Sequence, residues 1–131
     1  MSYSNPISLN YCYGHKNDLG DGTPEQWSFK GPAGKKGMLI DIGIHVTETF
    51  ACDQTPAAVQ VGTSSDNDAY GKLNIPDGTA ATNVFNVQDD TDAIIAEALP
   101  ADTQIEVTST NGVDAGTEAG IGYEYVSVLW Y

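Results

Sequence analysis

The stretch GMLIDIGIHVTETF, residues 37–50, carries the most regular pattern in this chain. Its apolar residues fall on every second position: Met38, Ile40, Ile42, Ile44 and Val46. Polar or small residues occupy the positions between them. A period of two residues is typical of a β-strand with one buried face. The stretch therefore predicts a long strand whose apolar face forms the centre of a core.

Shorter alternating segments surround this strand and are separated by turn residues such as Pro76-Asp77-Gly78 and Asn111-Gly112. They lie at residues 7–13, 27–29, 57–61, 73–75, 84–87, 105–108 and 121–131. One short helix is expected at Asp92–Leu99, after a run of aspartates and before Pro100. About eight strands and at most one short helix predict an all-β, jelly-roll-like β-sandwich. An immunoglobulin-type sandwich is disfavoured because its Cys–Trp–Cys arrangement is missing.

The chain divides into two parts by composition. Residues 27–131 contain nearly all the predicted strands and form the β-sandwich domain. Residues 1–26 form an N-terminal segment followed by a long polar loop, GHKNDLGDGTPEQ at 14–26. We expect this segment to pack partly on the domain.

The charge of the chain excludes several classes of partner. Eighteen carboxylates stand against five lysines and no arginine, which gives a net charge of −13. Such a surface repels nucleic acid over most of its area. No apolar run is long enough to cross a membrane, and MSYSNPISLNYCYG at the N-terminus lacks the regions of a secretion signal. Binding to neither nucleic acid nor membrane is expected.

Catalytic and cofactor chemistry has little support in the sequence. His15 and His45 stand in no nucleophile setting, and nothing singles out one carboxylate pair. Asp66-Asn67-Asp68 and Asp89-Asp90-Thr91-Asp92 offer oxygen ligands of the kind calcium prefers, but turn chemistry explains both runs as well. Cys12 and Cys52 are expected as free thiols, with a disulfide as the alternative. We therefore expect no enzyme and no cofactor.

Aromatic residues gather near the two termini of the sequence. They are Tyr3, Tyr11, Tyr13, Trp27, Tyr123, Tyr125, Trp130 and Tyr131. Tyrosine and tryptophan are enriched at protein interfaces, so contact with other subunits is the preferred interpretation. A sugar-binding platform, built on Trp27 or the terminal tyrosines, is the alternative.

Four stretches of the chain resemble one known family. They are GMLIDIGIHVTETF (37–50), VQVGTSSDNDAYGKLNIPDGT (59–79), DTDAIIAEALPADTQIEVT (90–108) and GIGYEYVSVLWY (120–131). They are similar to the small jelly-roll decoration, or cement, proteins of tailed-bacteriophage virions. The likeness covers residues 27–131 through strand order and loop texture, and it includes no catalytic or ligand motif.

The resemblance implies a virion structural protein, synthesised in the host cytoplasm and bound to the capsid exterior. Its partners would be the major capsid protein and two further copies of itself, in a homotrimer at three-fold sites of the lattice. For shell contact, aromatic and basic clustering favours Tyr3, Ile7, Leu9, Lys35 and Lys36. For subunit contact it favours Tyr123, Tyr125 and Trp130. Another virion role, in a head fibre or the tail, and a carbohydrate-binding β-sandwich are the alternatives.

Overall fold

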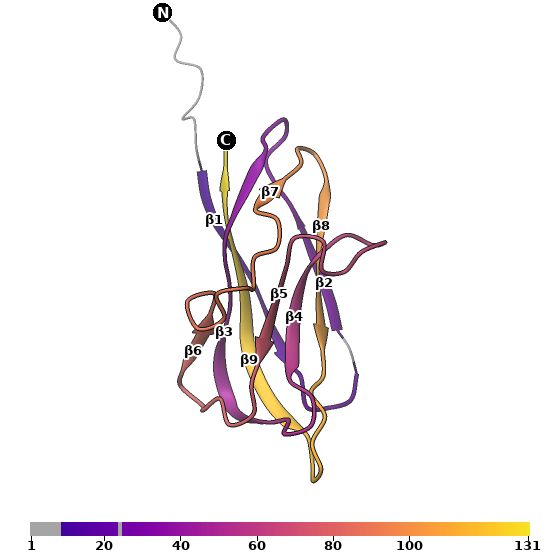
Figure 1. Ribbon diagram of the computed structural model, residues 1–131. Helices are drawn as coiled ribbons and strands as arrows, with labels where there is room; N and C mark the ends of the chain where they lie inside the picture. The colour runs from indigo at the N-terminus through magenta and orange to yellow at the C-terminus, as the bar shows by residue number, and fades with distance from the viewer. Residues whose placement is uncertain (1–8, 24) are drawn as a thin grey trace, which may run out of the picture.

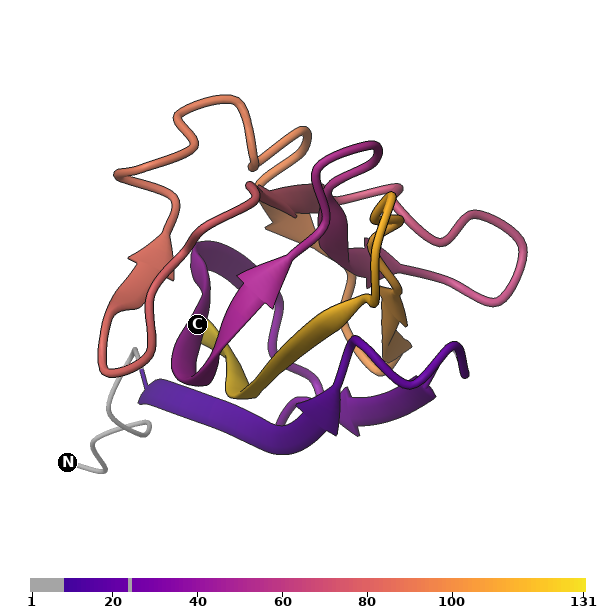
Figure 2. The ribbon, with the colours of Figure 1, turned by 90° about the horizontal axis from the view of Figure 1, so that it is seen from below.

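The computed structural model describes residues 9–23 and 25–131. Within these ranges the chain forms nine β-strands and no helix. The strands make two antiparallel sheets that face each other as a β-sandwich, and the two layers are visible when the molecule is seen from below (Figures 1 and 2). The prediction of an all-β, jelly-roll-like sandwich is confirmed.

The two sheets combine strands that are far apart in the sequence. Sheet A has the order β1-β9-β3-β6, with β7 also paired to β3, and sheet B has the order β2-β8-β4-β5. The strands of sheet A are β1 (Leu9–Asp18), β3 (Gly37–Ala51), β6 (Val84–Asn86), β7 (Ala98–Leu99) and β9 (Ala119–Trp130). Those of sheet B are β2 (Glu25–Lys30), β4 (Ala57–Gly62), β5 (Gly71–Ile75) and β8 (Gln104–Thr110).

The core lies between the sheets and consists mainly of β-branched residues, which pack well on a pleated surface. Sheet A contributes Ile42, Ile44, Val46, Val126, Val128 and Trp130, and sheet B contributes Val59, Val61, Leu73, Ile75, Ile105 and Val107. All of these side chains are 0–1% exposed. The apolar period of two thus predicts the core strands, as expected for sheets with one buried face.

The first residues of the long strand β3 depart from the predicted alternation of buried and exposed side chains. Met38 and Ile40 were assigned to the core face, but Ile40 is 46% exposed while Leu39 is 2% exposed. The pairing with β9 shifts between Leu39 and Asp41, which is a β-bulge. An extra residue in a strand exchanges the two faces beyond it. Leu39 therefore enters the core, and the predicted alternation holds only from Ile42 onward.

The predicted polar loop at 14–26 is shorter than expected. Strand β1 continues through Asp18 and pairs residue by residue with β9. Asn17 and Leu19 are buried, and the Leu19 amide donates to the Gly120 carbonyl at 2.8 Å. Backbone pairing along β9 explains why these polar residues form a strand, because a paired strand satisfies its amides and carbonyls whatever its side chains are.

The predicted helix at Asp92–Leu99 does not form. Ala93 lies in the core, and its carbonyl accepts from the Lys72 amide at 2.7 Å. The amides of Ile95 and Ala96 both donate to Tyr70, and the Glu97 carbonyl accepts from Leu39. The backbone groups that a helix would use internally are thus bonded to β3 and to the start of β5. A helix of two turns is too short to compete with such tertiary contacts.

The two ends of the sandwich carry different connections. The end drawn uppermost in Figure 1 holds the start of β1, the β2–β3 connection at 31–36 and the end of β9. The opposite, lower end holds the connections at 52–56, 76–83 and 111–118. These two ends are called the upper end and the lower end below.

Candidate functional site

The outer face of sheet A presents an exposed row of side chains across four strands. Lys16, Tyr123, His45 and Val84 are direct cross-strand partners, one from each of β1, β9, β3 and β6. All four are exposed, with Tyr123 at 50% and Val84 at 52%. The Lys16 Nζ lies 5.8 Å from the centroid of the Tyr123 ring, a cation–π arrangement. The structure therefore places the predicted interface residue Tyr123 at the centre of an accessible surface.

Tyr125, the next outward residue of β9, is held in place by its own chain. Its hydroxyl donates to Asp41 Oδ2 at 3.0 Å. Its ring covers Gly43, where an added Cβ would come within 2.3 Å of the ring. Burial raises the pKa of the Tyr125 hydroxyl. Tyr125 is thus a half-buried side chain, fixed in position beside the exposed Tyr123.

The outer face of sheet A carries few charges for so acidic a protein. Its neighbouring rows pair Asn10 with Leu129 and Met38, and Cys12 with Ser127 and Asp41. Within these middle rows Lys16 and Asp41 are the residues of opposite charge. The next row, at the end of β1, joins Asp18, Ile121 and Glu48, so charge balances in the middle of the face and its rim there is acidic.

Trp130, predicted for subunit contact, is placed in the core. It is 1% exposed, and its Nε1 donates to the Tyr13 hydroxyl at 3.0 Å. The ring packs against the backbones of Gly31 and Gly37, where a Cβ would approach it to 2.6 and 2.7 Å. This burial between two glycines accounts for Trp130 within a single chain, so its side chain is not available to a second copy in this fold.

The upper end brings together the described residues of the predicted shell contact. Leu9 pairs with Trp130, and Lys36 exchanges two backbone hydrogen bonds of 3.0 and 2.8 Å with Tyr131. Lys35 is in the same connection, and Lys30, which the sequence analysis did not select, ends β2 beside it. Three of the five lysines therefore lie at this end. Tyr3 and Ile7, also predicted for shell contact, lie outside the described residues.

The lower end is rich in carboxylates that stabilise its turns. Asp77 accepts from the Cys52 amide at 2.9 Å, and Asp53 accepts from the Ala115 amide at 2.8 Å. Asp114 accepts from the amides of Asp53 and Gly116, and these bonds hold the pKa of Asp114 below its usual range. The three connections of this end contain no lysine. Lysines thus gather at the upper end, where Asp102 accepts from the Gly34 amide at 2.8 Å, and are missing from these three lower connections.

A buried carboxylate lies between the sheets. Glu124 is 0% exposed and accepts hydrogen bonds from Trp27 Nε1 at 3.0 Å, from Asn17 Nδ2 at 3.4 Å and from the Ser109 hydroxyl. Burial raises the pKa of Glu124, and the three hydrogen bonds offset part of that effect. The sequence analysis missed this residue, although Glu124 shares the inward parity of Val126, Val128 and Trp130.

The Glu124 cluster is closed to substrates. Asn17 and Ser109 are 2% and 1% exposed, so no ligand reaches the carboxylate in this structure. His15 lies at the edge of the cluster, with its Nε2 3.8 Å from Glu25. Trp27, the predicted sugar platform, is half-buried and directs its N–H to Glu124. These residues therefore hold the two sheets together and do not form an open site.

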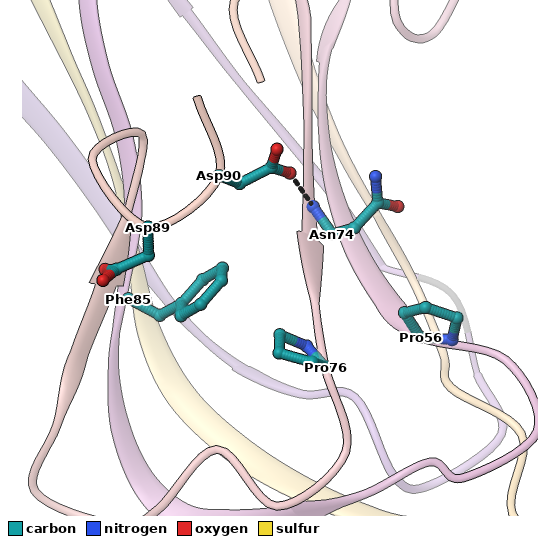
Figure 3. Close-up of a pocket in the computed structure, with 6 residues that line it drawn as sticks. All are labelled: Pro56, Asn74, Pro76, Phe85, Asp89 and Asp90. Carbon is teal, nitrogen blue, oxygen red and sulfur yellow. Dashed lines mark hydrogen bonds between the residues drawn. The ribbon is translucent and has the colours of Figure 1, made fainter. Parts of the chain in front are cut away.

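A cleft of about 290 Å³ opens between β5 and the segment that follows β6 (Figure 3). It is lined by Pro56, Asn74, Pro76, Phe85, Asp89 and Asp90. Asp90 Oδ2 accepts from the Asn74 amide at 3.1 Å, drawn as the dashed line in Figure 3, and Asp89 Oδ2 accepts from the Asn86 amide at 3.0 Å. Asp89 and Asp90, two of the five aspartates considered for calcium, thus line this cleft.

The acidic runs form no clear metal centre in the described part of the chain. No three histidine, cysteine, aspartate or glutamate side chains gather there at ligand spacing. In the first run, the Asp66 amide donates to Thr63 Oγ1 at 3.1 Å, and this bond closes the turn before Asp68. Cys12 is exposed on β1, Cys52 is buried, and both thiols are free. Burial raises the pKa of Cys52.

Comparison of the chain with known protein families, with curated proteins and with solved structures finds no match. In the part of the chain that the structure describes, no helix has the length and apolar character needed to span a membrane.

Proposed function

We propose that this protein is a virion structural protein that binds the outer surface of a tailed-phage capsid and stabilises the shell as a homotrimer. The observation that carries the proposal is the distribution of lysines: Lys30, Lys35 and Lys36 lie at the upper end, beside Asp102, and none lies in the three lower connections. A protein with a net charge of −13 meets the least repulsion from a negatively charged partner at the end where its lysines gather.

The capsid role needs differential affinity, since a protein that binds only the assembled shell shifts the equilibrium toward that shell. Each contact of a specific interface buries about 800 Å² per partner. Three copies joined together add avidity to contacts that are individually weak. In this proposal the upper end supplies the capsid contact of each copy.

The outer face of sheet A supports the trimer part of the proposal. Two copies of so acidic a chain repel each other over most of their surfaces. The middle rows of this face, around Tyr123 and Val84, are exposed, partly aromatic and balanced in charge, so self-association meets less repulsion there than at the lysine-free lower end. Tyrosine is among the residues enriched at such interfaces.

Charge reversal at Lys36 is expected to weaken capsid binding by about tenfold, because like charges at an interface oppose association. The measurement is co-sedimentation of the protein with expanded shells of the virus whose genome carries this sequence. Lys72→Glu makes the same change in net charge on β5 and is the matched control. Equal losses for Lys36→Glu and Lys72→Glu would place the capsid contact elsewhere.

Replacing Tyr123 with glutamate is expected to convert the trimer into a monomer. Three added carboxylates would face one another around the contact, where the wild type buries an aromatic ring. Light scattering after size exclusion should give three times the 13.9 kDa chain mass for the wild type and one chain mass for the variant. Tyr131→Glu, at a tyrosine of similar exposure, is the control. A monomeric wild type would rule out self-association before shell binding.

A further inference from the structure

We propose that the cleft between β5 and β6 is a binding site for a neutral saccharide. This inference does not depend on the capsid role, because the cleft is lined by Pro56 and Pro76 of the lower connections and by no residue of the upper end. It also differs from the aromatic platform at Trp27 that the sequence suggests.

The position of the cleft makes it accessible. Strand β5 ends the order of sheet B and β6 ends the order of sheet A, so the cleft occupies an open side of the sandwich. Its walls are the half-buried Phe85 ring and the exposed rings of Pro56 and Pro76. Figure 3 shows the Phe85 ring directed into the space between the two strands. A sugar ring has apolar C–H faces, and such faces pack on aromatic and proline rings.

The polar groups of the cleft suit a ligand that donates hydrogen bonds. Asp90 is oriented by the bond from the Asn74 amide to its Oδ2, and its Oδ1 has no partner within the described residues. An ionised carboxylate only accepts hydrogen bonds. The Asn74 side chain, exposed at the rim, adds one donor group and one acceptor. Hydroxyl groups, which both donate and accept, satisfy this set.

Charge distinguishes a saccharide from ionic ligands. The net charge of −13 and the two aspartates disfavour phosphorylated or acidic sugars. A cation would need carboxylates that converge, but Figure 3 shows Asp89 directed away from Asp90, and each already accepts a backbone amide. A neutral hydroxylated ligand is therefore the best match.

The size of the cleft sets the length of the ligand. Sites for small molecules have volumes of about 300–1,000 Å³, and this cleft, at about 290 Å³, lies at the lower limit. One sugar ring fits such a space. A terminal residue of a longer glycan can enter as well, because the cleft opens to solvent between two sheet edges.

The test is an NMR titration of the full chain, labelled with ¹⁵N, with the methyl glycosides of glucose, galactose, mannose and N-acetylglucosamine. At least one should give saturable shifts at Asn74, Phe85 and Asp90, with a Kd in the millimolar range that is common for a single small ligand. Asp90→Asn keeps an acceptor for the Asn74 amide but loses the charge, and it should weaken binding by about tenfold. Phe85→Leu keeps an apolar side chain without the ring and should weaken binding as well.

Asp66→Asn removes an exposed carboxylate outside the cleft lining and is the control, with an unchanged Kd expected. The absence of shifts with all four glycosides would overturn the proposal, and so would shifts confined to residues outside the cleft.

Titrations with calcium chloride and with Nα-acetyl-lysine amide complete the design. Saturable shifts in the cleft with either cation, but not with a glycoside, would identify a cation site instead. Capsid binding by the Asp90→Asn variant should equal that of the wild type, which separates this site from the capsid role.

Discussion

Replacing Trp130 with alanine is expected to reduce the free energy of unfolding by about 3–5 kcal/mol. The ring is 1% exposed and fills the space between Gly31 and Gly37, two positions where only glycine leaves room for it. Its removal takes away a large buried apolar area and leaves a cavity that rigid neighbouring strands cannot close. It also leaves the Tyr13 hydroxyl without its donor. Since single domains are stable by about 5–15 kcal/mol, this change removes a large share of the total.

Urea denaturation followed by circular dichroism measures this effect. Trp130→Phe retains most of the apolar volume and should cost much less than alanine, which keeps the prediction testable if the alanine variant does not fold. Tyr131→Ala, at the adjacent and 48% exposed residue, is the control and should change stability by less than about 1 kcal/mol. A cost for Trp130→Ala similar to that of the control would show that the ring is not an anchor of the core.

Replacing Glu124 with alanine is expected to cost about 2–4 kcal/mol, because the Trp27 and Asn17 donors would remain buried without an acceptor. Glutamine is expected to behave differently. It keeps the shape of the side chain and one acceptor oxygen, and it removes the charge whose burial is unfavourable. The comparison of glutamine with wild type therefore isolates the ionisation of Glu124.

The glutamine comparison should depend on pH. Burial raises the pKa of Glu124 in the folded state above its ordinary value of 4.5. Below that pH the group is protonated both folded and unfolded, so ionisation does not affect stability. As the pH rises from 4.5, the unfolded chain ionises first, and the wild type loses stability until the pH exceeds the raised folded pKa. The glutamine variant lacks this loss and should gain relative stability over that range.

Melting temperatures of wild type and Glu124→Gln between pH 4 and pH 8 test this prediction. The difference between the two proteins removes the general effect of the other carboxylates, which titrate in both. Glu97→Gln makes the same chemical change at an exposed glutamate and is the matched control. If the Glu124→Gln difference did not change with pH, the buried carboxyl would ionise as easily folded as unfolded.

The sequence predicts the sheets better than it predicts their edges. Alternation from Ile42 to Val46 and from Val126 to Trp130 identifies the two central strands of sheet A, because an apolar period of two is imposed directly by burial. The bulge after Leu39 leaves no such pattern, since it depends on how β3 pairs with β9. The segment at Asp92–Leu99 has helical signals, but its amides and carbonyls bond to Tyr70, Lys72 and Leu39, which are distant in sequence.

The candidate sites were predictable to different degrees. Tyr123 was selected from aromatic clustering as a subunit contact, which stays a prediction, and the structure exposes its side chain. Trp130 belongs to the same cluster, but its parity with Val126 and Val128 directs it inward. The cleft could not be predicted, since Phe85, Asn74 and Pro56 come from three separate segments. Glu124 was predictable in principle, as a charged residue on an otherwise apolar strand face.

The central place of β9 in sheet A has a consequence for biosynthesis. Strand β1 pairs only with β9 in the sheet order, and Leu9 is matched with Trp130. At translation rates of about 5–20 residues per second, β1 therefore waits on the order of ten seconds for the strand that completes it. During that time β1 and β3 both present unpaired edges, which are prone to association with other chains. Emergence of β9, not of the first strands, is thus the event that permits the sandwich to close, and a chain interrupted before β9 should be found in aggregates or degraded.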